Sequence, residues 1–151
     1  TQADVERVRE LAAKGFAAMT ADEQAEWLAG MKGTYNASDM NRVGTALNYL
    51  AARLSSICGR SIAWTAKTDW AVTDIPAASQ AETYRRQIQD IRDALAYPAG
   101  TPDAPQLARL TYIGANDIER ILALCEDLIV NVAKSFRHTG AAECAAGGLL
   151  T

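Results

Sequence analysis

Apolar residues recur at steps of three and four along most of this chain, which is the period of an amphipathic helix. The clearest example follows Asn36, whose side chain can cap a helix, with Asp39 near the positive end of the helix dipole. Gly59 is a natural stop. We therefore predict a helix from about residue 36 to Cys58, with this apolar stripe: Met40, Val43, Leu47, Leu50, Ala51, Leu54 and Ile57.

Two shorter helices are predicted before it. The first spans about Thr1 to Lys14 and ends at Gly15, with Val5, Val8, Leu11 and Ala12 facing inward. The second begins at a capping box, in which Thr20 and Glu23 each satisfy a backbone donor, and is expected to end at Gly33. Its apolar anchors are Trp27, Leu28 and Met31.

Two more helices are predicted in the second half. One follows Pro76 and carries a narrow apolar seam; the other runs from about Tyr112 to Phe136 and closes near His138 and Gly140. The seam is Ala81, Tyr84, Ile88, Ile91 and Leu95, opposite a face expected to be solvated: Arg85, Arg86, Gln89, Asp90, Arg92 and Asp93. The last helix has a wide stripe: Ile118, Ile121, Leu122, Cys125, Leu128, Ile129, Val132 and Phe136. We expect the helix after Asn36 and the last helix to pack together, with the seam helix alongside.

Two stretches lack the helical period. Residues 59–75 form either an extended strap or two short strands, at 61–66 and 70–73. Residues 97–105 hold three prolines and a glycine, which exclude a helix, and form a loop long enough to cross the bundle. The prediction is an all-α fold of about five helices packed as a small bundle over residues 1–140. Residues 141–151 are expected to be an extended or disordered tail.

Composition removes several classes of function. The net charge of -3 and the pI near 5.1 argue against a nucleic-acid or anionic-membrane partner, which would need clustered Lys and Arg. No apolar run approaches the length of a membrane span, and no signal peptide is visible in this chain. Cys58, Cys125 and Cys144 have neither disulfide-framework nor zinc-site spacing, so they are expected to be two buried thiols and one in the tail.

Catalytic chemistry has few candidates. His138 is the only histidine, and no phosphate-binding loop, nucleophile elbow or zinc-binding helix motif is present. Carboxylate pairs such as Glu126-Asp127 fall on predicted helix surfaces. We therefore expect no enzymatic activity, no metal and no cofactor.

The strap holds the best candidates for a ligand or partner surface, namely Trp64, Lys67, Thr68, Asp69 and Trp70. Aromatic rings beside an Asp and a Thr can stack on a sugar and bind its hydroxyl groups. The alternative is that both rings plug the open end of the bundle. Sequence alone leaves both interpretations open.

The chain also resembles a domain of phage and prophage tail-associated proteins, which are fibre-like or minor structural proteins from gut bacteria. The resemblance is carried by Lys32-Gly-Thr-Tyr-Asn-Ala-Ser-Asp-Met-Asn-Arg-Val43 and Tyr49-Leu-Ala-Ala-Arg-Leu54. It continues at Lys67-Thr-Asp-Trp70, Asp74-Ile-Pro76, Leu110-Thr-Tyr112 and Ala115-Asn-Asp-Ile-Glu-Arg-Ile121. The end of the chain departs from the short Ser-Gly-Glu-like repeat of that family.

This resemblance implies a non-enzymatic virion structural module for assembly or host adsorption, made in the bacterial cytoplasm. Its expected partners are other tail proteins or the rest of a longer polypeptide, and oligomers are possible. The alternative is a carbohydrate- or cell-surface-binding module that uses Trp64 and Trp70.

Overall fold

The computed structural model describes the backbone of residues 1–147 and the side chains of residues 1–136. Five α-helices follow one another: α1 (Gln2–Lys14), α2 (Ala21–Leu28), α3 (Ala37–Cys58), α4 (Ala78–Asp93) and α5 (Tyr112–Gly147). Two 3-10 turns, Phe16–Ala18 and Leu107–Arg109, lie between them, and the described residues contain no strand. The predicted all-α fold is therefore confirmed, and residues 59–75 form an extended strap instead of a hairpin.

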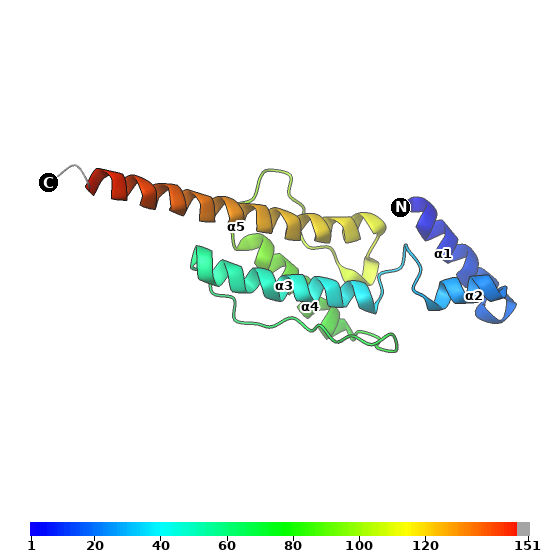
Figure 1. Cartoon of the computed structure of the whole chain (residues 1–151). Helices are drawn as coiled ribbons and strands as arrows, with labels where there is room; N and C mark the ends of the chain where they lie inside the picture. Colours follow the sequence, from blue (N-terminus) through cyan, green and yellow to red (C-terminus); the bar gives the residue numbers. More distant parts are fainter. Residues whose placement is uncertain (148–151) are drawn as a thin grey trace.

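Helices α3, α4 and α5 form a bundle in which all three point the same way (Figure 1). Arg42 pairs with Glu119 at 2.7 Å, and the Tyr49 hydroxyl donates to Glu126, so α3 and α5 lie parallel with a constant offset of 77 residues. Parallel neighbours need connections that return along the full length of the bundle. The strap and residues 94–111 are these connections. We predicted this crossing for the proline-rich loop within residues 94–111.

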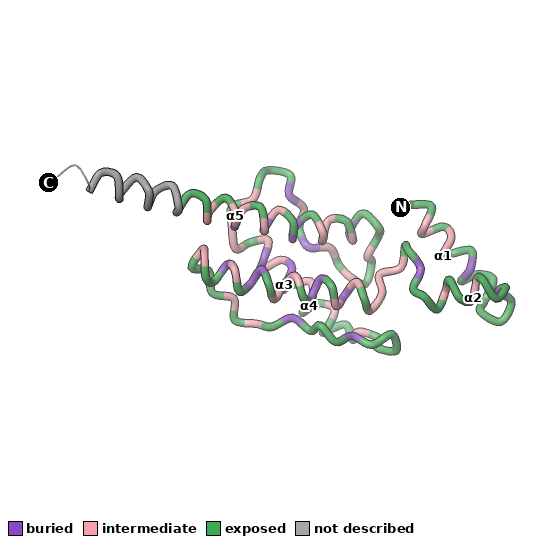
Figure 2. The backbone as a smooth tube through the Cα atoms, in the orientation of Figure 1, coloured by how far each residue is buried: buried purple, intermediate pink, exposed green. Residues whose placement is uncertain are grey.

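The bundle core is built from the apolar stripes of the three helices, as predicted. Leu47 and Leu54 of α3, Ile88 and Ile91 of α4, and Ile121 of α5 are almost completely buried. Figure 2 shows the buried positions running along the sides on which these helices face one another. Two further predicted members of the core, Leu50 and Cys125, are buried as well, whereas Leu128 is half-buried.

Helices α1 and α2 form a separate N-terminal lobe (residues 1–34) at one end of the bundle (Figure 1). The predicted capping box at Thr20 is present, and Thr1 forms a second one with Asp4. The lobe has its own small core of Leu11, Met19 and Met31, with Val8 and Trp27 packed against it.

The predicted end of α2 is wrong. The helix stops at Leu28, because Gly30 takes a positive φ of 85° and turns the chain three residues before the predicted stop at Gly33. Met31 therefore enters the lobe core from a turn, and Leu28, predicted as an anchor, is 73 % exposed.

The polar face of α4 is only in part the solvated surface that we predicted, because Arg86 and Asp93 are exposed but the other four residues are half-buried. Asp90 accepts a hydrogen bond from Trp64 of the strap, and the side-chain amide oxygen of Gln89 accepts one from the Ala104 backbone N–H. The Arg92 guanidinium donates to the carbonyl oxygens of Thr101 and Pro102. Both return connections thus run along α4, and its polar side chains satisfy their backbone groups.

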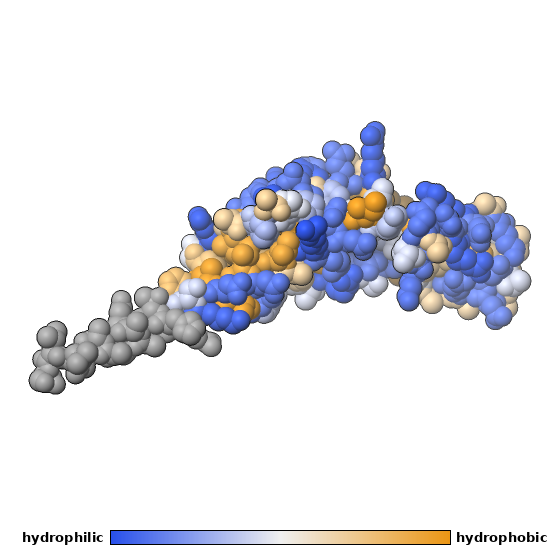
Figure 3. Space-filling view, turned by 90° about the horizontal axis from the view of Figure 1, so that it is seen from above, coloured by the Kyte–Doolittle hydropathy of each residue, from blue (hydrophilic) through white to orange (hydrophobic). Residues whose placement is uncertain are grey.

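Helix α5 is longer than predicted, because it continues past His138 and Gly140 to Gly147. The Ala-rich sequence of residues 141–146 favours helix, so the predicted tail begins inside α5; residues 148–151 lie outside the described part. Phe136, predicted as buried, is 63 % exposed. Each residue of α3 lies beside the α5 residue that comes 77 positions later, so Cys58, the last residue of α3, lies beside Ser135. Phe136 therefore lies past the end of α3, which cannot cover it. Apolar side chains gather on this end of the bundle (Figure 3).

Candidate docking groove beside the strap

The strap is held on α3 by two asparagine side chains. The Asn48 amide donates to the Ala66 carbonyl oxygen at 3.0 Å, and its oxygen accepts from the Ala66 N–H at 2.7 Å. Asn41 makes the same pair of bonds with the backbone of Trp70, at 2.9 and 2.7 Å. These side chains replace the ladder hydrogen bonds that a neighbouring strand would supply, which explains how an extended segment stays ordered without a sheet.

Gly44 lies between the two asparagines and allows the strap to approach the helix. A Cβ at this position would overlap the carbonyl oxygen of Lys67, far closer than real Cβ contacts come. Asn41, Gly44 and Asn48 are spaced by three and four residues, so they line one edge of the apolar stripe of α3. Our sequence interpretation missed this signal, although the spacing was visible.

The two tryptophans of the strap are turned inward. The Trp64 ring is half-buried, and its Nε1–H donates to Asp90 Oδ2 at 2.7 Å. The Trp70 ring is only 7 % exposed and belongs to the bundle core. Its buried Nε1–H has no hydrogen-bond partner among the described residues, which is an energetic cost that the apolar contacts of the ring offset.

Lys67, Thr68 and Asp69, the other candidates, are exposed between the tryptophans. The Lys67 ammonium lies 2.6 Å from Asp69 and 4.9 Å above the Trp70 ring centroid. Its hydrogen bond holds the pKa of Asp69 below the usual range, so that carboxylate stays charged. Lys67 thus covers the outer face of Trp70. The five candidate residues are neighbours, but they do not present two open aromatic faces.

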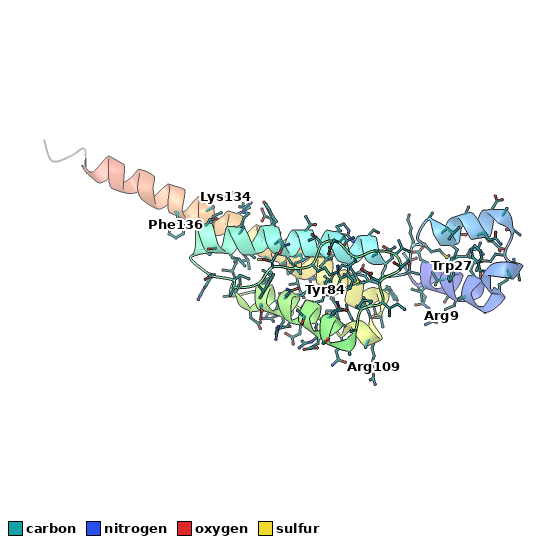
Figure 4. All side chains as sticks on the ribbon, turned by 90° about the horizontal axis from the view of Figure 1, so that it is seen from below. Arg9, Trp27, Tyr84, Arg109, Lys134 and Phe136 are labelled. Atoms are coloured by element: carbon teal, nitrogen blue, oxygen red, sulfur yellow. The ribbon has the colours of Figure 1, made fainter. Side chains whose placement is uncertain are left out.

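An apolar groove of about 960 Å³ lies between the N-terminal lobe and the bundle. Figure 4 shows Trp27 of the lobe on one side of this junction and Tyr84 inside the bundle on the other. The groove is lined mainly by Trp27, Leu28, Met31, Met40, Trp70 and Leu110. Residues from the lobe, α3, the strap and the segment before α5 therefore meet here, which no local sequence pattern predicts.

Two of the three most exposed large aliphatic side chains of the described structure line this groove. Val72, which lines the groove, is 95 % exposed, and Leu28 on the opposite wall is 73 % exposed. Ile75 is 91 % exposed and comes between the groove residues Asp74 and Pro76, but it does not itself line the groove. Aliphatic side chains gathered around an apolar hollow are typical of a surface that is covered in an assembly.

A pair of tyrosines lies where the lobe joins the bundle. The hydroxyl groups of Tyr35 and Tyr84 are 2.6 Å apart, and the rings meet edge to face. Burial raises the pKa of Tyr35 to about 12 and that of Tyr84 further. Both hydroxyls stay neutral at physiological pH, so this pair fastens residue 35 to α4 and offers no general base.

The described residues contain no group of His, Cys, Asp and Glu side chains placed to hold a metal ion. Among the helices of the described residues, none has the length and apolar content of a membrane span. The side chain of His138 lies outside the described set. Comparison with family models, with curated proteins and with solved structures found no match to this chain.

Proposed function

We propose that this chain is a non-enzymatic structural module of a phage or prophage virion, part of a tail-associated or fibre-like protein, and that it docks to its partner through the groove. The sequence resemblance supplies the class of assembly. The observation that carries the docking role is the position of Leu28 and Val72, which expose aliphatic side chains around one apolar hollow.

The elongated arrangement supports the same role. The lobe and the groove lie at one end, whereas the last turns of α5 extend beyond α3 at the other (Figure 1). A module of this form suits joining two components across its length. The short, self-contained bundle between the ends fixes their separation, because three parallel helices share one core.

The test is incorporation into particles of the phage that encodes the chain. Leu28→Asp combined with Val72→Asp places two charges at the rim, where a docked apolar partner would have to bury them. The matched control is Phe16→Asp, because Phe16 is also an exposed apolar residue of the lobe, 45 % exposed, but does not line the groove.

The measurement is the amount of chain in purified particles, by quantitative mass spectrometry, with circular dichroism of the isolated proteins to verify folding. We expect the groove variant to be lost from particles and the control to remain. Equal incorporation of the two variants would refute docking through the groove, and absence of the wild-type chain from particles would refute the virion role.

The alternative, a carbohydrate- or cell-surface-binding module, has weaker support. Thr68 and Asp69 are exposed and can bind hydroxyl groups, but sugar stacking on Trp70 would require Lys67 to move off the ring. A glycan array with wild type, Trp64→Ala and Trp70→Ala tests it directly. Binding that either substitution abolishes would favour this alternative over a purely structural role.

A further inference from the structure

We infer that the N-terminal lobe is a hinged arm that pivots about Thr34 and Tyr35 and thereby changes the width of the groove. The inference concerns motion within the isolated chain and does not depend on which partner fills the groove. In the described residues the lobe and the bundle have separate cores, and no polar contact joins them. Hollows lie beside their junction, and the linker is held to the lobe on one side and to the bundle on the other.

The two bodies share no core. The lobe core is formed by Leu11, Met19 and Met31, and no residue of the lobe belongs to the core of the bundle. Because each body buries its own apolar side chains, rotation of one against the other does not expose either core. The cost of such a movement is therefore confined to contacts at the junction itself.

Polar contacts do not lock the junction either. Arg7 and Lys14 pair with glutamates inside the lobe, and Arg42 pairs inside the bundle. Throughout the described side chains, no hydrogen bond or ion pair joins residues 1–34 to the bundle. A rigid interface between domains normally shows a large apolar contact or a polar network, and relative motion is the default without them.

The junction is also hollow in two places. Besides the groove, a second hollow of about 430 Å³ lies between α1 and the start of α5. Arg9 of α1 and the Asp39 and Glu119 carboxylates line this second hollow, and Arg9, visible in Figure 4, is exposed and makes no ion pair with a described residue. Unfilled space beside the junction gives the lobe room to move, and Arg9 would approach the two carboxylates as this hollow narrows.

The linker identifies the pivot. Gly33, at a φ of 92°, packs so closely on the α1 backbone at Asp4 that a Cβ would overlap it, so the chain up to Gly33 moves with the lobe. Tyr35 is fastened to Tyr84 and moves with the bundle. Thr34 is also held to the lobe, because its N–H and its hydroxyl both donate to the Met31 carbonyl oxygen. The rotation must therefore occur about the backbone bonds that join Thr34 to Tyr35, where a few dihedral angles can absorb a hinge movement.

The experiment is a spin-label distance measurement by double electron–electron resonance on the full chain. The background carries Cys58→Ser and Cys144→Ser, and the buried Cys125 is kept. Labels at the exposed positions Ala13→Cys and Ala52→Cys report the distance from the lobe to the bundle. The control pairs, each within one body, are Ala13→Cys with Ala25→Cys and Ala52→Cys with Ala123→Cys.

We expect the distance distribution between lobe and bundle to be broader than both control distributions. A distribution no broader than the controls would overturn the hinge. Backbone ¹⁵N relaxation of the unmodified chain provides a second measurement that needs no substitution. Distinct apparent rotational correlation times for residues 2–28 and for α3 support the hinge, and a single common value overturns it. Neither result depends on particle incorporation, so failure of the docking function would be recognised separately.

Discussion

Replacing Gly44 by alanine should destabilise the protein, although alanine is the better helix former. In an exposed helix the change would gain about 1 kcal/mol. Here the new Cβ would overlap the Lys67 carbonyl oxygen, which is backbone and has no flexible side chain to move. The strap must therefore shift until the contact exceeds 3.0 Å, the limit that real Cβ atoms respect.

That shift acts on the hydrogen bonds by which Asn48 holds Ala66 and Asn41 holds Trp70, on either side of Lys67. We call these two pairs of bonds the asparagine clamps. Their four hydrogen bonds measure 2.7–3.0 Å, so a displacement of several tenths of an ångström stretches at least one pair past the usual hydrogen-bond range. Losing two hydrogen bonds to a buried backbone costs roughly 2–4 kcal/mol. After the helix gain is subtracted, the net loss of unfolding free energy is about 1–3 kcal/mol.

The matched control is Gly114→Ala in α5. Gly114 is also helical and buried, but a Cβ there would meet only side-chain atoms, those of Leu110 and Pro105 at 3.1 Å, and these neighbours need to give by only a few tenths of an ångström. We expect this variant to lie within about 1 kcal/mol of wild type.

Urea denaturation gives the unfolding free energies, and amide hydrogen exchange measures the protection of the N–H groups that Asn41 and Asn48 bind. In Gly44→Ala the N–H groups of Ala66 and Trp70, which donate to Asn48 and Asn41, should lose protection. A Gly44→Ala protein as stable as Gly114→Ala, with both amides still protected, would refute the role that we assign to Gly44.

Three further predictions follow from the packing and the charges. Leu50→Ala should cost roughly 2–5 kcal/mol in urea denaturation, and Leu128→Ala less because Leu128 is half-buried; the reverse order would contradict the packing. Trp70→Phe keeps a buried ring and removes the unpaired Nε1–H, so its unfolding free energy should stay within about 1 kcal/mol of wild type, and a loss above about 3 kcal/mol would show that the N–H has a partner. The Lys14 ammonium lowers the pKa of Glu23 from 4.5 to about 2, so the stability that this pair gives the lobe is present above pH 4.5 and lost as the pH falls toward 2. Amide exchange of α2 across this range should show the loss in wild type and a flatter profile in Glu23→Gln; identical profiles would contradict it.

Local chemistry made the helices predictable. The capping residues Thr1, Thr20 and Asn36 each satisfy backbone donors within three residues, so sequence alone identifies where α1, α2 and α3 begin. Periodicity also identified the buried stripes, because a helix face is a local property. The error at Phe136 has a different origin, since its exposure depends on where α3 ends in space.

The groove could not be predicted in this way. Its walls come from Trp27, Met40, Trp70 and Leu110, which are brought together by the parallel arrangement of the helices and by the position of the lobe. Within the strap, the aromatic residues were recognised and their burial was one of two interpretations, but the sequence could not decide between them. The missing information was the side-chain clamp from Asn41 and Asn48, which turns Trp70 toward the core.

The central claim is that the groove between the lobe and the bundle is covered by a partner in the assembled particle. Thiol labelling with a maleimide tests it at single positions, in the Cys58→Ser and Cys144→Ser background, with Val72→Cys in the groove rim and Ala52→Cys on the exposed side of α3 as the control. We predict that both cysteines react in the isolated chain, and that in purified particles Val72→Cys becomes protected while Ala52→Cys still reacts. Equal labelling of Val72→Cys in the isolated chain and in particles would contradict the claim.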